Sequence, residues 1–420
     1  MNVKSCALLV SCFLWFAGPL AAAEMPTAKP EEVGLSAAEL EKARAAVSQL
    51  IKEGKVAGAV VLVARHGKIV LFDAQGVRDV SSGKPMEKDT ILRLYSMTKP
   101  ITTVAAMILF EKGLLHLDYP VSKYLPELKG VKVHAGGAGG ELKLVAASRG
   151  MSIRDLMRHT SGLTYGSWLE KTPVAELYDK HKIMAPGDTL EKTVAKLGKL
   201  PLVQQPGNRF HYGVSTDVLG RVVEVVAKKN LADFVREQIF EPLDMQDTAY
   251  YVPEKKQERF GATHGRNPEG KLIVIDSPAK SPYLNKTAPP FGGHGLVSTA
   301  RDYARFCQML LNKGQLDGKR ILQEKTVALM TTNQLPKEGI PIGVGALRME
   351  GFGFGLGFYV RLAADKKNPG DRVGEYGWGG AASTYLWVSP KDDLFVVAAG
   401  IGPELKPLIY AAIEDPKKGH

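Results

Sequence analysis

Strand-like segments stand at both ends of this 420-residue chain, and helix-like segments lie between them. Near the N-terminus, two apolar runs flank a turn at Arg65–Lys68, a pattern that predicts a β-hairpin. Near the C-terminus, "STYLWV" and "LFVVAAG" flank the turn "SPKDD" and predict a second hairpin. Residues 150–250 read mainly as helices and loops. Strands from both ends predict one α/β layer with a helical domain inserted into it.

These patterns divide the chain into four parts. We expect an N-terminal signal segment, then an α/β domain made of two stretches that are separate in the sequence, with a mainly helical domain between them. The predicted fold class is α+β, an antiparallel sheet flanked by helices. The boundaries are 1–23 for the signal, 24–130 and 289–420 for the two α/β stretches, and 131–288 for the helical domain.

The first residues have the pattern of a secretory signal peptide. Lys4 provides a positive charge and "CALLVSCFLWFA" is apolar. Small residues in "AAAE" then favour cleavage near Ala23. An alternative is a lipoprotein signal ending at Cys12, but the apolar run continues past that residue. We therefore expect an exported protein, periplasmic or secreted, without a transmembrane anchor after the signal is removed.

Cys307 is the cysteine that remains once the signal is removed, so no internal disulfide is expected in the mature protein. It lies in "RDYARFCQMLL", which has the pattern of an amphipathic helix. A thiol nucleophile is one interpretation, and a buried structural cysteine is the one we favour.

The net charge of the chain is +11. Its basic residues are dispersed, without a Lys/Arg block and without the interleaved aromatic residues of a nucleic-acid groove. We interpret them as a solvated cationic surface and expect no nucleic-acid partner.

A Ser-x-x-Lys spacing opens the apolar helix predicted within Tyr95–Gly113. Residues three apart share a helix face, so the Ser96 hydroxyl and the Lys99 amine should meet. A serine hydroxyl is a poor nucleophile until a nearby base takes its proton. The same spacing occurs at Ser81–Lys84 and Ser277–Lys280, where the surroundings predict turns. From spacing alone, Ser96 as a helix N-cap beside a solvated Lys99 stays open.

Other catalytic patterns are weaker in this sequence. No Gly-x-Ser-x-Gly and no His-Glu-x-x-His stretch occurs, so neither an α/β-hydrolase nor a zinc site is indicated. His159 and His211 are candidates for a Ser-His pair, although nothing in the pattern marks either as a base. No cofactor or metal is called for.

Four segments, in this order, resemble the serine β-lactamase-like superfamily, and most closely its family VIII carboxylesterases, which are similar to class C β-lactamases. The resemblance covers nearly all of the mature chain and implies a β-lactamase/transpeptidase-like fold with serine hydrolase activity. The segments are "LRLYSMTKPITTVAAMILFEKGLLHLDYPVSKYLPEL", "MSIRDLMRHTSGLTYG", "EPLDMQDTAY" and "GHGLVSTARDYARF".

The resemblance assigns catalytic roles. Ser96 matches the family nucleophile and Lys99 its activating amine. Tyr212, in "FHYGVSTDVLG", matches the tyrosine that works with the lysine as general base and acid. A literal Tyr-x-Asn also occurs at Tyr283–Asn285, but it lacks a following helix, so Tyr212 is preferred.

The resemblance also implies the substrate side of the site. "WGG" stands where lactamases carry Lys-Thr-Gly, and the backbone N–H groups of Ser96 and Ala381 would form the oxyanion hole. His294, in a glycine-rich turn, either contacts substrate or has no role. The pocket is expected to include Val214, His294, Trp378, Gly379 and Gly380.

Two departures from the lactamase pattern bear on substrate. Val214 replaces an asparagine, and Trp378 replaces a lysine that helps to hold the substrate carboxylate. Both changes favour a neutral, apolar ester over a charged lactam. We therefore predict an exported serine hydrolase that cleaves short-chain carboxylic esters through an acyl-enzyme, with a small-molecule ester as its partner. The alternatives are a D,D-peptidase, amidase or weak β-lactamase on the same fold, and a non-catalytic binding protein.

Overall fold

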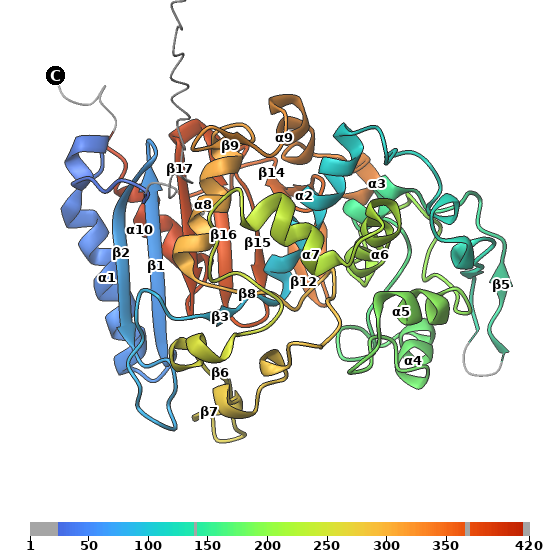
Figure 1. The fold of residues 1–420 in the computed structure, drawn as a ribbon, viewed down its shortest axis with the longest axis horizontal. Coiled ribbons are helices and arrows are strands. Elements are labelled where there is room, and N and C mark those ends of the chain that lie inside the picture. Colours follow the sequence, from blue (N-terminus) through green and yellow to red (C-terminus); the bar gives the residue numbers. More distant parts are fainter. Residues whose placement is uncertain (1–23, 138–140, 366–369, 415–420) are drawn as a thin grey trace, which may run out of the picture.

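The structure, a computed structural model, describes residues 24–137, 141–365 and 370–414, so the predicted signal peptide lies outside the described residues. Within them, the largest sheet has seven strands in the order β13-β14-β15-β16-β17-β1-β2 (Figure 1). All neighbours in this sheet pair antiparallel. Its strands are β1 (Gly58–Arg65), β2 (Lys68–Gly76), β13 (Phe352–Phe354), β14 (Tyr359–Arg361), β15 (Tyr376–Gly380), β16 (Thr384–Ser389) and β17 (Leu394–Ala399).

Both ends of the chain contribute to this sheet, as the sequence predicts. The predicted hairpins are β1–β2 and β16–β17, and β1 pairs with β17 with Val60 opposite Ala399. Side chains alternate between the faces of a strand, so Val60 and Leu62 enter one core and Val61 and Val63 another. The sheet is therefore buried on both faces.

Helices cover each face. Residues of α1 and α10 pack with Val61 and Val63, whereas residues of α2 and α8 share the core of Val60 and Leu62. Helices α4 to α6 lie beyond the other end of the sheet from α1 (Figure 1). The helices are α1 (Ala37–Lys52), α2 (Thr98–Glu111), α3 (Ile153–Met157), α4 (Pro173–Lys180), α5 (Leu190–Leu197), α6 (Ser215–Ala227), α7 (Leu231–Val235), α8 (Ala300–Leu311), α9 (Glu324–Met330) and α10 (Lys406–Ala411).

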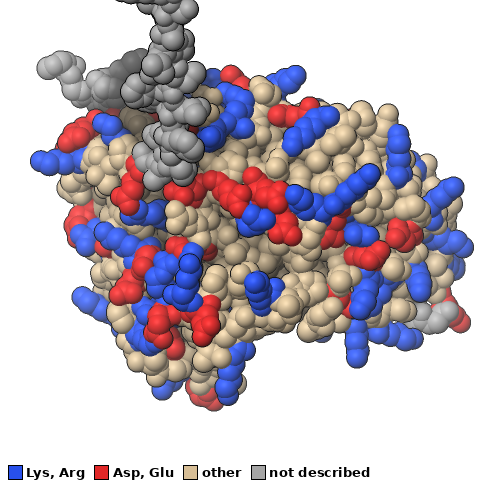
Figure 2. Space-filling model, in the orientation of Figure 1, with Lys and Arg blue, Asp and Glu red and all other residues tan. Residues whose placement is uncertain are grey.

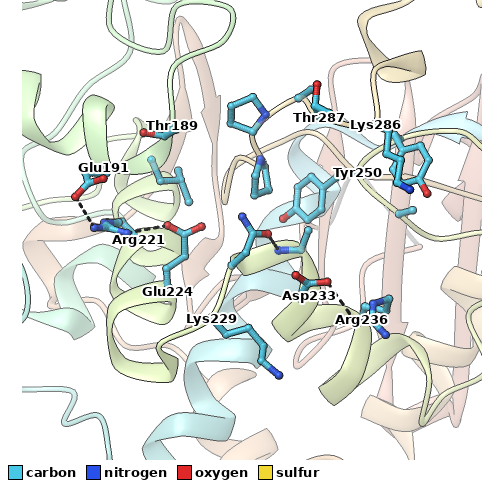
Figure 3. A pocket seen from close by; sticks show the side chains of 18 of the residues that line it. Thr189, Glu191, Arg221, Glu224, Lys229, Asp233, Arg236, Tyr250, Lys286 and Thr287 are labelled. Carbon is cyan, nitrogen blue, oxygen red and sulfur yellow. Dashed lines mark hydrogen bonds and ion pairs between the residues drawn. The ribbon is translucent and has the colours of Figure 1, made fainter.

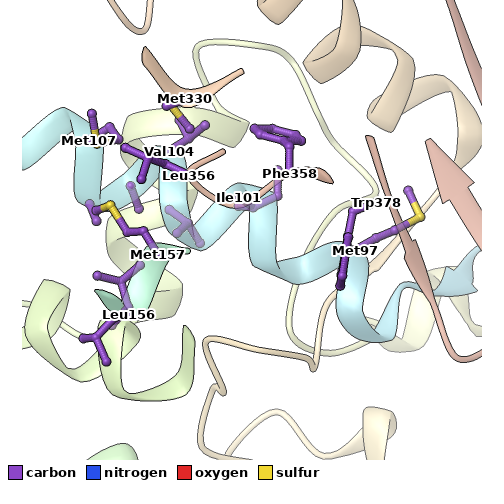
Figure 4. Packing of buried hydrophobic residues seen from close by; sticks show 14 of the residues in the cluster. Met97, Ile101, Val104, Met107, Leu156, Met157, Met330, Leu356, Phe358 and Trp378 are labelled. Atoms are coloured by element: carbon purple, nitrogen blue, oxygen red, sulfur yellow. The ribbon is translucent and has the colours of Figure 1, made fainter. Parts of the chain in front are cut away.

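Helix α2 is the centre of the larger core. All but its last two residues are buried, so the predicted apolar helix is buried on all its faces. Side chains of α3 and of the segment around Leu356 reach α2 from different sides (Figure 4). Full burial of a residue such as Ile101 stabilises the fold by about 1.5–3 kcal/mol. Gly113, with φ 69°, follows the last turn in the left-handed conformation that glycine adopts readily.

One helix start considered in the sequence analysis differs from the structure. Ser96 is not the N-cap of α2: it lies in a 3-10 turn, Tyr95–Met97, and the α-helix begins at Thr98. Helix α6 begins at Ser215, and its N-cap is Val214, which has no side-chain oxygen to cap it. Ser215 is buried in the first turn of α6, whereas Ser96 is partly exposed.

The remaining strands are short. The segment "GFGFGLGFYV" forms a hairpin, β13–β14, and the described part of residues 131–288 contains the hairpins β4–β5 and β6–β7 besides its helices. One of these, β6–β7, contacts β3, where Asp276 pairs with Arg93 at 2.6 Å. The pairs are β3 (Leu92–Arg93) with β8 (Val297–Ser298), β4 (Val133–His134) with β5 (Leu144–Val145), β6 (Thr263–Arg266) with β7 (Leu272–Asp276), β9 (Gln315–Leu316) with β10 (Lys319–Arg320), and β11 (Ile342–Val344) with β12 (Leu347–Met349).

Charged side chains of both signs lie among one another on the face drawn in Figure 2. Across the described ranges, no helix combines the length and the apolar character that a membrane crossing needs.

Candidate active site

Ser96 is held at the junction of the sheet and α2. Just before it, the Leu94 N–H donates to the Leu296 carbonyl at 2.8 Å, and the Leu94 carbonyl accepts from the Thr384 hydroxyl at 3.2 Å. Tyr95 has a φ of 43°, a left-handed conformation that is strained for a bulky residue. The backbone therefore turns sharply at this point, and Ser96 lines a cavity next to the turn.

Lys99 is buried, with 1% of its surface exposed, on the first turn of α2. Its Nζ lies 3.1 Å from Ser96 Oγ, 3.1 Å from the Tyr165 hydroxyl and 2.8 Å from the Gly293 carbonyl oxygen. Three hydrogen-bond partners hold the amine against Ser96, so the alternative of a solvated Lys99 is wrong.

Tyr212 completes the contacts of Ser96. Its hydroxyl donates to Ser96 Oγ at 2.7 Å. The ring is fixed by aromatic neighbours, with centroids at 4.9 Å for His159, 5.4 Å for Tyr165 and 5.5 Å for Trp378. Ser96 Oγ thus lies within hydrogen-bond distance of an amine and a phenol.

The two candidate histidines have other neighbours. His159 packs against aromatic rings at tilted and edge-on angles, and burial lowers the pKa of its imidazole well below 6.5, with the charge of Lys99 acting in the same direction. His211 Nε2 lies 3.1 Å from Glu170 Oε1. Tyr283, the alternative tyrosine, packs beside Tyr95, with ring centroids 6.5 Å apart. The structure brings Tyr212, and none of these three, into hydrogen-bond contact with Ser96.

Tyr165 is a site residue that the sequence analysis did not single out. Besides its bond to Lys99, it lines the cavity next to Ser96. Burial raises the pKa of its hydroxyl well above 10, and the neighbouring Tyr212 and Asp217 add to this effect. Its position within "TSGLTYG", one of the segments that carry the family resemblance, was the available signal.

The cavity has a volume of about 570 Å³ and a largely apolar lining. The segment 165–184 supplies much of its wall, and Trp168 stands at its rim with 73% of its surface exposed. Lys182 and Met184 adopt left-handed conformations on either side of Ile183, so the backbone turns here. All three residues line the cavity. The large apolar and aromatic lining residues are Tyr95, Tyr165, Trp168, Tyr178, Ile183, Met184 and Tyr212.

The end of β15 brings Ala381 to the same cavity. A Cβ at Gly380 would lie 2.1 Å from the Leu94 carbonyl oxygen, so only glycine permits this approach. Ala381, Val214 and His294 line the cavity, but Trp378, Gly379 and Gly380 do not. Trp378 packs behind Tyr212 instead, which differs from its expected place in the pocket. The reason is the strand register, because Trp378 points into the core beside Phe354.

His294 occupies the turn between Gly292 and Gly295. Its ring stacks on Phe291 with centroids 4.7 Å apart. Burial lowers the pKa of His294, while the nearby Asp217 acts in the opposite direction. The imidazole at the cavity wall is therefore predominantly neutral at pH 7.

A larger cavity of about 860 Å³ lies between α5, α6, α7 and the segment before Phe291 (Figure 3). Several of its charged groups pair with one another: Arg221 bonds Glu191 and Glu224, and Arg236 bonds Asp233. It holds none of the residues around Ser96. Across the described ranges, no group of three or more His, Cys, Asp or Glu side chains is placed to hold a metal ion.

Comparisons with known proteins identify the family of the chain. The family model described as Beta-lactamase matches residues 43–400. Esterase EstB of Burkholderia gladioli is 32% identical over 376 residues, covering 84% of this chain and 88% of the relative. Lovastatin esterase of Penicillium rubens is 31% identical, covering 83% and 90%.

Among solved structures, EstCE1, described as a hydrolase with promiscuous acyltransferase activity, superposes with a TM-score of 0.76. It is 28% identical, and the match covers 90% of this chain and all of that one. The predicted β-lactamase/transpeptidase-like fold is thereby confirmed. The chain belongs to the beta-lactamase family, and it is a serine hydrolase on that fold, with esterases among its relatives.

Proposed function

We propose that this protein is an exported carboxylesterase that cleaves short-chain esters through an acyl-enzyme on Ser96. The observation that carries the proposal is the position of Ser96 Oγ, within hydrogen-bond distance of both Lys99 Nζ and Tyr212 OH at the edge of a largely apolar cavity. An activated serine needs such a base within reach.

In the proposed reaction, Ser96 Oγ bonds to the ester carbonyl carbon as its proton passes to the Lys99–Tyr212 pair. The backbone N–H groups of Ser96 and Ala381 stabilise the negative charge on the carbonyl oxygen. The pair then returns the proton to the leaving alcohol. A water molecule attacks the acyl-enzyme in the second half, with the same groups moving its proton and releasing the acid.

The lining of the cavity supports an ester over a β-lactam. Val214 and most of the lining residues in the wall between 165 and 184 are apolar or aromatic. Lys182 is the basic residue of the lining, and it belongs to that wall. Neutral acyl groups therefore fit this environment better than charged bicyclic lactams.

The test is hydrolysis of a p-nitrophenyl ester series and of a chromogenic cephalosporin by the purified mature protein. We expect turnover of the short esters, little of the cephalosporin, and a loss of at least about 10³-fold in Ser96→Ala. Ester turnover that survives in Ser96→Ala would contradict the nucleophile assignment. A preference for the cephalosporin would favour the lactamase alternative. Binding without turnover in the wild type would favour a non-catalytic protein.

Export is tested separately. We expect the full-length chain, expressed in a Gram-negative host, to appear in the periplasmic fraction with Glu24 as its first residue, as read by N-terminal sequencing. Retention of the uncleaved chain in the cytoplasm would contradict the signal-peptide assignment.

Acyl transfer to an alcohol is a second candidate activity. The cavity is large for a short acyl chain alone, and EstCE1 carries a hydrolase activity together with a promiscuous acyltransferase activity. An alcohol bound against the aromatic wall would compete with water for the acyl-enzyme. Formation of the new ester, measured by chromatography with added benzyl alcohol, distinguishes transfer from hydrolysis.

A further inference from the structure

Asp217, in the first turn of α6, is a buried carboxylate beside the candidate site. It has no exposed surface, and its Oδ1 accepts the Gly293 N–H at 2.8 Å. Its Oδ2 is also buried and has no hydrogen-bond partner among the described residues. A buried carboxylate with an unpaired oxygen is costly, so its presence requires an explanation.

The group that Asp217 holds is itself a partner of Lys99. The Gly293 N–H donates to Asp217, and the Gly293 carbonyl accepts from Lys99 Nζ at 2.8 Å. A Cβ at Gly293 would lie 2.5 Å from Asp217 Oδ2, so the carboxylate packs directly on the glycine. Gly293 therefore links the two groups: its N–H bonds the Asp217 carboxylate, and its carbonyl bonds the Lys99 amine.

The turn is also held from α2. The Thr102 hydroxyl donates to the Gly292 carbonyl at 2.7 Å, and the Thr98 hydroxyl accepts from the Leu296 N–H at 3.2 Å. Asp217 holds the same turn from α6. The bonds from both helices fix the Gly293 carbonyl, which accepts from Lys99 Nζ.

Four ionisable groups face Asp217 from the elements packed around it. They are Lys99 of α2, Tyr165 of the loop after α3, Tyr250 of the segment before β6, and His294 of the turn, whose Nδ1 lies 3.8 Å from Oδ1. Burial raises the pKa of both tyrosines and lowers that of His294, so these three are neutral near pH 7. Lys99 is then the group of the four that can carry a positive charge beside the carboxylate.

We propose that Asp217 is a positioning residue for Lys99. It fixes the Gly292–Gly295 turn so that the Gly293 carbonyl holds the amine against Ser96, and its negative charge stabilises the positive charge that Lys99 gains as Ser96 loses its proton. The proton moves from Ser96 Oγ to the amine while Oγ bonds to the carbonyl carbon. A carboxylate serves the histidine of a Ser-His-Asp triad in the same two ways. The inference rests on the proposed esterase reaction.

The test compares Asp217→Asn with the wild type on one short p-nitrophenyl ester. The amide keeps an oxygen for the Gly293 N–H but removes the charge. We expect kcat to fall about 10- to 100-fold, with KM within about 3-fold of the wild type. The acidic limb of the kcat/KM profile should move to lower pH, because loss of an anion disfavours the protonated amine.

Asp302→Asn is the matched control. Asp302 is also a buried carboxylate that accepts a backbone N–H from another segment, that of Asp247 at 2.7 Å, but it lies outside the cavity lining. We expect its kcat to stay at the wild-type value. An Asp217→Asn enzyme with wild-type kcat, or with a lower kcat and an unmoved acidic limb, would overturn the proposal.

A second variant applies if Asp217→Asn does not fold. Thr102→Val loosens the same turn from α2 without changing charge, and we expect a kcat about 3- to 10-fold lower with an unmoved acidic limb. Wild-type kcat in Thr102→Val would overturn the positioning role. The rate of Ser96→Ala is subtracted from every other rate, so that only turnover that depends on Ser96 is compared. Turnover that persists in Ser96→Ala contradicts the proposed function and not this inference.

Discussion

Two tyrosines reach the Ser96–Lys99 pair, and they touch different members of it. Tyr212 donates to Ser96 Oγ, whereas Tyr165 bonds Lys99. We expect Tyr212→Phe to lower kcat/KM by about 10²- to 10⁴-fold, because it removes a group that moves the serine proton. Tyr165→Phe should lower kcat/KM by about 10-fold or less, because it removes only one hydrogen bond to the Lys99 amine. Steady-state kinetics of both variants check this, and equal losses would contradict the assignment of roles.

Cys307 is the clearest case of a residue with no access to substrate. It is fully buried in α8, and burial raises the pKa of its thiol well above the ordinary value. The protonated, inaccessible thiol should not react, so treatment of the native protein with iodoacetamide is expected to leave esterase activity unchanged. Rapid inactivation that Cys307→Ala prevents would support the thiol-nucleophile interpretation instead.

At the scale of elements, the loop and helix of residues 165–184 form a wall that no single motif predicts. Trp168 packs beside Tyr165, with ring centroids 5.4 Å apart, and leaves its other surface to solvent at the cavity rim. An aromatic platform of this kind binds the apolar part of a substrate.

Trp168→Ala tests the wall. We expect KM for 2-naphthyl acetate to rise about 2- to 10-fold, since one aromatic contact is lost. KM for ethyl acetate, which has the same acyl group and a small alcohol, should change little and serves as the internal control. An equal rise for both esters would mean that the variant alters the site as a whole.

At the scale of the whole molecule, acid stability depends on the buried Asp155 at the start of α3. Burial by itself would raise the pKa of this carboxyl, but hydrogen bonds from Arg149, the Ser152 N–H and Thr160 lower it from 3.8 to about 2. The depression corresponds to about 2 kcal/mol of stability. Because the folded pKa is below the unfolded one, this stability is present above about pH 4 and is lost as the pH falls towards 2.

Urea unfolding of Asp155→Asn at several pH values checks this prediction. The variant should be about 2 kcal/mol less stable than the wild type at pH 7, and the difference should shrink as the pH falls from 4 towards 2. Asp118→Asn is the control, because Asp118 also pairs with an arginine but is largely exposed and should contribute much less. A difference that stays constant over this pH range would contradict the role of Asp155.

What the sequence determined by itself was local. Apolar alternation and turn residues predicted the hairpins β1–β2 and β16–β17, because pleating and turn geometry act within a few residues. The helical repeat predicted α2. The three-residue spacing of Ser96 and Lys99 at its start predicted their contact. The quoted segments also placed the chain in its family.

Only the tertiary structure decided which distant groups meet at that pair. Tyr165, Tyr212 and the Gly293 carbonyl lie 66, 116 and 194 residues from their partners in the chain. The same packing places Trp378 behind Tyr212 and buries Asp217 against Gly293. Such contacts depend on how helices and strands pack against one another. No periodicity or spacing along the chain encodes them, because the free energy that selects them comes from burial shared by the whole core.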